Sequence, residues 1–200
     1  PLTRLEMARI AVRATDPTLQ KPEVHMDDRS FMYNATKKGL IQGLAGGELA
    51  PDKTTTRAQS VTIIERILAV NAGEKLPVDK YALGAAELEL KRTNIFTVMP
   101  EFFGGKVVEP WNIENLTIET PDGKYKGVVE KLVAIDFGDP NDPNRNILGD
   151  IEDLYWTACC GKNYKVANYP DSYGIIAISR TEFNKDTSIY GDSSPIVYIS

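Results

Sequence analysis

The chain of 200 residues carries a formal net charge of −5 at pH 7; 42% of its residues are hydrophobic and 26% are charged. This balance is typical of a globular protein and excludes a disordered or fibrous chain. No apolar run approaches the roughly 18 residues that cross a bilayer, which excludes a membrane-spanning helix. The length allows one large domain or two modest ones.

Charge is divided unevenly along the chain. Residues 1–76 hold 11 Lys and Arg against 9 Asp and Glu, whereas residues 77–200 hold 12 against 19. The mildly basic front half is suited to an anionic ligand, and the acidic rear half repels one. Nucleic acid is a poor candidate partner, because its binding usually needs a much stronger basic stripe.

An internal repeat marks the front half. A shift of 53 positions places Thr3-Arg4-Leu5-Glu6 over Thr56-Arg57-Ala58-Gln59. In each copy a Thr precedes a Glu or Gln by three residues, which is the pattern of a reciprocal helix cap. The sequence therefore predicts two helix starts, with structural caps formed by Thr3, Glu6, Thr56 and Gln59.

The two predicted helices differ in their apolar faces. After Thr56, Val61, Ile64 and Leu68 fall on one helical face with Ile67 beside them, and we expect this stripe to pack against neighbouring helices. The matching face after Thr3 is smaller and should let another helix approach closely; it consists of Leu5, Ala8, Ala11 and Val12.

A third helix is expected between these two. It covers about Arg29 to Lys38 and ends at Gly39, where a left-handed residue commonly closes a helix. Four glycines in nine residues and then Pro51 follow, which indicates a tight loop. We thus expect an α+β protein, with a helical module at 1–76 (helices about 3–15, 29–38 and 56–71).

The order of these pieces resembles the S-layer homology domain. The resemblance covers about residues 1–72, as one partial and one complete repeat. The pieces that carry it are Ala35, Gly39-Leu40-Ile41, Gly43, Pro51-Asp52, Thr56-Arg57-Ala58-Gln59 and Arg66.

The resemblance implies anchoring to a bacterial cell wall. Members of the family usually pack three repeats around a central bundle, and the grooves between repeats hold pyruvylated secondary cell-wall polysaccharide. Carried over by position, Arg4 and Arg57 are the anion-binding candidates and Gly43 lies in the matching turn. By their chemistry, Lys37 and Lys38 would add longer-range attraction.

A purely structural role is the alternative for the basic residues. Arg4 and Arg57 could instead form surface salt bridges. We assign Arg13 and Arg66, which lie deeper in their helices, to packing or pairing. The lone His25, in a charged loop, is expected to be solvated and cannot form a metal site by itself.

The rear half differs from the front half in its expected secondary structure. Residues 77–92 read as a connecting helix or linker, and residues 93–200 as a mostly antiparallel β-rich domain. The predicted strands are Thr93–Val98, Leu116–Glu119, Val128–Phe137, Gly174–Ser179 and Pro195–Ile199. Pro121-Asp122-Gly123 predicts a hairpin turn.

The rear half offers only weak chemical signals. Asp136, Asp139 and Asp142 lie in one loop that could hold calcium. A solvated acidic loop is the favoured interpretation. No other cofactor is expected. The aromatic residues Trp111, Tyr155 and Trp156 could form a sugar-stacking platform, but they fit a core better. The adjacent Cys159 and Cys160 are expected to be free thiols.

These features together favour a non-catalytic, secreted surface protein, located in the cell wall or S-layer. Its expected partners are cell-wall polysaccharide and other S-layer subunits. One alternative is an extracellular carbohydrate-active enzyme that the front module tethers to the wall. Another is a structural module that supports assembly of a surface lattice.

Overall fold

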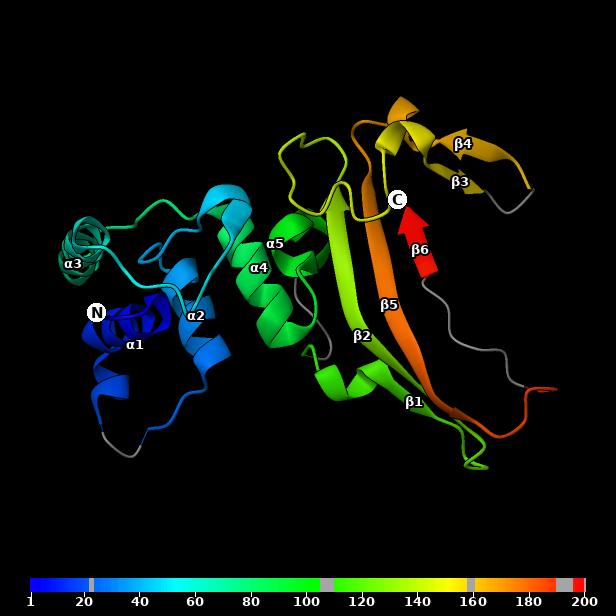
Figure 1. The fold of residues 1–200 in the computed structure, drawn as a ribbon, viewed down its shortest axis with the longest axis horizontal. Helices are drawn as coiled ribbons and strands as arrows, with labels where there is room; N and C mark the ends of the chain where they lie inside the picture. Colours follow the sequence, from blue (N-terminus) through cyan, green and yellow to red (C-terminus); the bar gives the residue numbers. More distant parts are fainter. Residues whose placement is uncertain (22–23, 105–109, 158–160, 190–195, 200) are drawn as a thin grey trace. The chain divides into compact units, whose positions relative to one another are not determined.

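The computed structural model describes residues 1–21, 24–104, 110–157, 161–189 and 196–199. The chain divides into two compact units, Pro1–Leu90 and Lys91–Ser200. Helices build the first unit, and antiparallel strands dominate the second (Figure 1). The fold class is therefore α+β, as the sequence predicts.

Four α-helices form the first unit: α1 (Arg4–Thr15), α2 (Asp28–Lys37), α3 (Arg57–Asn71) and α4 (Lys80–Lys91). Short 3₁₀ turns at Pro17–Gln20 and Ala45–Gly47 lie in the connections. The first three helices agree with the predicted spans to within about one residue, the precision that helix ends allow.

Side chains close the ends of these helices. In α1 the Thr3 hydroxyl accepts from the Glu6 amide at 3.1 Å, and a Glu6 carboxylate oxygen accepts from the Thr3 amide at 2.7 Å. In α3 the equivalent distances between Thr56 and Gln59 are 3.2 and 3.0 Å. Gly39, at φ +70°, follows α2 in the left-handed conformation that favours glycine.

The core of the first unit lies where α1 meets α2. Ala8 and Ala11 are fully buried in a cluster with Phe31 and Ala35 of α2. Alanine on both sides of this contact lets the two helix backbones approach closely. The close approach predicted from the small face of α1 is therefore confirmed.

The prediction for α3 was wrong in its choice of face. Val61, Ile64 and Leu68 are 56%, 51% and 64% exposed, whereas Ile63 and Ile67 are buried. The reason is tertiary: α3 packs on α1, and the Ile63 and Ile67 side of the helix joins the core. In the described chain no element covers the stripe of Val61, Ile64 and Leu68.

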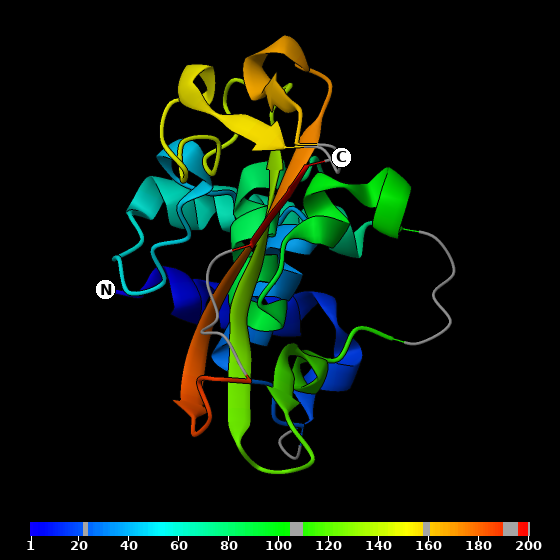
Figure 2. The ribbon, with the colours of Figure 1, turned by 90° about the vertical axis from the view of Figure 1, so that its right-hand side faces the viewer.

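The second unit is built on an antiparallel sheet with the order β1-β2-β5-β6. The strands are β1 (Thr117–Glu119), β2 (Tyr125–Asp136), β5 (Tyr173–Asn184) and β6 (Ile196–Ile199). The two long strands β2 and β5 run side by side (Figures 1 and 2). Val133 lies opposite Ile176 in this pairing. Val133, Ala134 and Ile135 are consecutive and all buried, so both faces of the sheet are covered here. Ala134 belongs to a core cluster with Ile95 and Met99.

Turns and short elements complete the second unit. The predicted hairpin forms between β1 and β2, where Gly123 has φ +64°. A small separate hairpin of β3 (Tyr155–Thr157) and β4 (Asn163–Lys165) was not predicted. Three 3₁₀ turns lie at Ile113–Leu116, Ile151–Asp153 and Val166–Asn168.

The predicted strand at Thr93–Val98 was wrong. Thr93 forms only an isolated parallel bridge with Leu132. The Asn94 side chain then takes the place of a strand backbone: it accepts from the Ala134 amide at 2.7 Å and donates to the Ala134 carbonyl at 3.0 Å. The chain continues as the short helices α5 (Ile95–Val98) and α6 (Pro100–Phe103).

The repeat provides a matched test of helix packing. Ala11→Ile should lower the free energy of unfolding by roughly 1–3 kcal/mol, because it overfills the contact between α1 and α2. Ile64→Ala, at the equivalent position of α3, should change it by less than about 0.5 kcal/mol, because that site is exposed. Urea unfolding of dilute protein measures both, and equal effects would contradict the packing described above.

Candidate functional site

A groove in the first unit brings together two arginines from the two copies of the repeat. Arg4 comes from the first turn of α1 and Arg66 from the middle of α3. The groove has a volume of about 270 Å³. The described residues that line it are Arg4, Ile41, Gln42, Gly43, Leu44, Ala58, Gln59, Thr62, Ile63 and Arg66, and none of these carries a carboxylate.

Arg4 is fixed by the loop that follows α2. Its side chain is only 4% exposed; Nε donates to the Leu49 carbonyl and Nη2 to the Gln42 carbonyl, both at 2.7 Å. Burial lowers the pKa of Arg4, and the nearby Glu48 carboxylate partly offsets this. The guanidinium stays charged at neutral pH, because an arginine titrates far above that range. Arg4 therefore supplies a rigid positive charge to the groove.

Gly43 shapes the loop but does not offer a free amide. Its N–H donates to Asp79 Oδ2 at 3.0 Å, while Asp79 Oδ1 accepts from the amides of Tyr81 and Ala82 at the start of α4. A Cβ on Gly43 would lie 2.6 Å from the Cα of Gly47. Glycine is thus required by the close approach of the two loop segments.

Arg66 and Gln59 present polar groups on one face of α3. The Gln59 Oε1 accepts from the Thr56 amide in the cap, which leaves its Nε2 as a donor toward the groove. Within the part of the chain that the structure describes, the Arg66 side chain forms no hydrogen bond or ion pair. Its planar fork of donors is therefore available to a ligand.

The structure does not bring together all the residues that the sequence predicts for this site. Arg4 and Gly43 line the groove, but Arg57 is exposed at the start of α3 and lies outside it. Lys37 lies over the Tyr33 ring at 5.6 Å, and Lys38 Nζ is 3.9 Å from Asp16 Oδ2.

Arg66 is a groove residue that sequence reasoning assigned to packing or pairing. The signal that identifies it is helical spacing, because Gln59, Thr62 and Arg66 follow each other by three and four residues and share a face. Its repeat partner Arg13 has a different environment, with its guanidinium carbon 5.3 Å from the centre of the Phe31 ring.

The acidic loop of the second unit uses its carboxylates to hold its own backbone. Asp142 Oδ2 accepts from the Asp136 amide at 2.8 Å, and Asp139 Oδ1 accepts from the Asn141 amide at 3.0 Å. Burial raises the pKa of Asp142, and the charges of Asp136 and Asp139 add to this effect. Among the residues with described positions, no group of three or more His, Cys, Asp or Glu is arranged to hold a metal ion.

The aromatic residues of the second unit do not form one platform. Trp111 packs edge-on against Phe96 at 5.8 Å, whereas Trp156 stacks on Tyr164 at 4.6 Å. Tyr155 is exposed. His25 is exposed in the first unit, and Cys159 and Cys160 lie outside the described residues.

Arg4 and Arg57 provide a second matched test. Arg4→Met should lower the free energy of unfolding by on the order of 2 kcal/mol or more, because two charge-assisted hydrogen bonds to the loop are lost. Arg57→Met should have little effect, because Arg57 forms no such bonds in the described chain. Chemical denaturation checks the difference; similar losses would show that the Arg4 contacts do not stabilise the loop.

The comparisons with known proteins identify one segment of the first unit. Residues 23–59 match the S-layer homology domain, a range that includes α2, the glycine-rich loop and the cap of α3. No curated protein and no solved structure gives a significant match to the chain. Among the described residues, no helix is long and apolar enough to span a membrane. The first unit therefore carries an S-layer homology domain at residues 23–59, which indicates anchoring at the cell surface or association with an S-layer.

Proposed function

We propose that the groove binds a carboxylate-bearing cell-wall polysaccharide, of the pyruvylated type, and thereby anchors the chain outside the cell. The observation that carries this proposal is the groove's charge: its described lining includes Arg4 and Arg66 and no carboxylate. Such a site favours an anion and disfavours a cation. The S-layer homology domain at residues 23–59 supports a wall polymer as the source of that anion.

The two arginines have different roles in this proposal. Arg4 is held by two backbone carbonyls and supplies fixed positive charge. Arg66 has its donor fork available and binds the carboxylate of the pyruvyl group through paired hydrogen bonds. Because the Gly43 amide already donates to Asp79, side chains and not this amide recognise the acid.

The remaining lining fits a sugar ring. The Gln59 amide and the Thr62 hydroxyl offer hydrogen bonds to sugar hydroxyl groups, and Ile41, Leu44 and Ile63 offer apolar surface to a ring face. The volume of about 270 Å³ lies just below the range for drug-sized ligands. The groove therefore accommodates a single acid-bearing sugar unit rather than a long stretch of polymer.

Titration calorimetry with purified wall polysaccharide tests the proposal. The 200-residue chain should bind the pyruvylated polymer, bind the depyruvylated form at least tenfold more weakly, and lose affinity as salt rises. Arg66→Met should weaken binding about tenfold or more, because a charge-assisted interaction is removed. Arg57→Met, a matched loss of charge on the same helix, should not.

Two results would overturn the proposed ligand. One is equal binding of the pyruvylated and depyruvylated polymers, which would show that the acid group is not recognised. The other is an equal loss of affinity in Arg66→Met and Arg57→Met, which would show that only the overall charge matters.

We further propose that the groove binds the polysaccharide without cleaving it. Glycoside hydrolysis usually needs two carboxyl groups on either side of the scissile bond, and the lining of the groove has none. Incubation of the chain with wall polysaccharide should leave the polymer's size distribution unchanged by chromatography. Shortening of the polymer that survives repurification of the protein would favour the alternative, a tethered carbohydrate-active enzyme.

A further inference from the structure

The solvent side of α3 is a ridge of apolar side chains that the groove does not use. Val61, Ile64 and Leu68 are each more than half exposed. Together with Arg57 they follow a spacing of four, three and four residues, which places all four on one side of the helix. We call the surface of these four residues the α3 ridge.

The internal repeat indicates that the α3 ridge is a packing surface. In α1 the residues equivalent to Val61 and Ile64 are Ala8 and Ala11, which are fully buried in the core with α2. The residue equivalent to Arg57 is Arg4, which is buried and bonded to two carbonyls. One copy of this helix face is thus covered, and the other is uncovered in the described chain.

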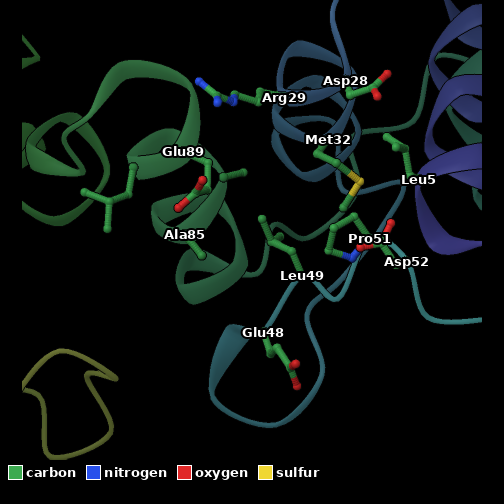
Figure 3. A pocket seen from close by; sticks show the side chains of 12 residues that line it. Leu5, Asp28, Arg29, Met32, Glu48, Leu49, Pro51, Asp52, Ala85 and Glu89 are labelled. Atoms are coloured by element: carbon green, nitrogen blue, oxygen red, sulfur yellow. The ribbon is translucent and has the colours of Figure 1, made fainter. Parts of the chain in front are cut away.

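A hollow on another surface of the same unit is complementary to the α3 ridge, because its floor is apolar and its edge is acidic. It measures about 610 Å³ and is larger than the groove. Its floor is apolar, and Figure 3 shows Met32, Leu49 and Pro51 close together, with Ala85 of α4 facing them. No residue of α3 lines it, so one molecule presents the α3 ridge and the hollow as separate surfaces.

The edge of the hollow is acidic. Four carboxylates line it, those of Asp28, Glu48, Asp52 and Glu89, against the single guanidinium of Arg29. Asp28 is already paired with Arg9. Glu48 and Asp52 form no salt bridge to any described residue. The Glu48 carboxylate already lies near the charge of Arg4, so Asp52 is the more available of the two to a cation brought by a partner.

We propose that the α3 ridge of one molecule inserts into the hollow of a second copy of this chain. The apolar side chains of the ridge would cover the apolar floor, and Arg57 would reach the carboxylates of Glu48 and Asp52. The ridge and the hollow therefore both offer exposed apolar surface, and their charges are opposite. Because the two surfaces differ, the contact is head-to-tail, and each added molecule leaves one ridge and one hollow free to continue the assembly.

Sedimentation velocity of the 200-residue chain over a range of concentrations gives the first test. The mass should rise with concentration beyond that of a dimer, because a head-to-tail contact continues unless the chain of molecules closes into a ring. A chain that stays monomeric at its highest soluble concentration overturns the proposal. Self-assembly should also weaken as salt rises and in Arg57→Glu.

Variants on the two surfaces test which groups meet. Leu68→Glu on the ridge and Ala85→Trp in the hollow should each weaken self-association about tenfold or more, because each removes or blocks the burial of an apolar side chain. Ile189→Glu is the matched control, since Ile189 is 63% exposed but belongs to neither surface. Circular dichroism and thermal unfolding show whether each variant keeps its fold, and Ile64→Gln replaces Leu68→Glu if that variant does not.

A mixing experiment separates the head-to-tail contact from other assemblies. Leu68→Glu retains an intact hollow and Ala85→Trp an intact ridge, so an equal mixture should form a one-to-one complex and grow no further. If α3 instead pairs with α3 of the partner, Ala85→Trp will assemble like the unmodified chain, and the proposal fails. Arg66→Met should assemble normally, which distinguishes a failure of this contact from a failure of glycan binding.

Discussion

The groove and the hollow of the first unit both depend on the guanidinium of Arg4. It is buried at the start of α1 and ties together the Gln42 and Leu49 carbonyls at the two ends of a glycine-rich loop. That loop lines the groove on one side through Gln42 and Gly43, and the apolar hollow on another through Leu49. A charge buried in this way is costly unless it is fully hydrogen-bonded, so the loop and the arginine stabilise each other's conformation.

A duplicated helix performs different tasks in its two positions. The capping boxes are alike in α1 and α3, because capping depends on residues within four positions of each other. What each helix buries is different: α1 packs its alanine face on α2, while α3 turns Ile63 and Ile67 to the core and leaves its other apolar stripe exposed. The same capping pattern thus starts a helix whose repeat-equivalent face is buried in α1 and, among the described residues, uncovered in α3.

The groove also depends on residues outside the segment that matches the S-layer homology domain. Arg4 precedes residues 23–59, and Arg66 follows them. Asp79 follows as well: its carboxylate bonds to the Gly43 amide and caps α4 at the same time, which connects the loop to the last helix of the unit. The family signature marks the loop and the cap, whereas the charge of the site is supplied by helices on either side.

The sequence by itself determined the helix starts, the left-handed glycine after α2, the β1–β2 hairpin and the α+β class. All of these rest on local geometry or on regular spacing. Tertiary structure alone decided which face of α3 is buried, which of the repeated arginines meets the loop, and that residues 93–98 form one bridge and a helix. Arg4 and Arg57 occupy equivalent positions directly after the same Thr cap, so the capping pattern alone does not separate them. The loop between residues 42 and 49 packs against one of them and not the other, and that long-range contact made only Arg4 part of the groove.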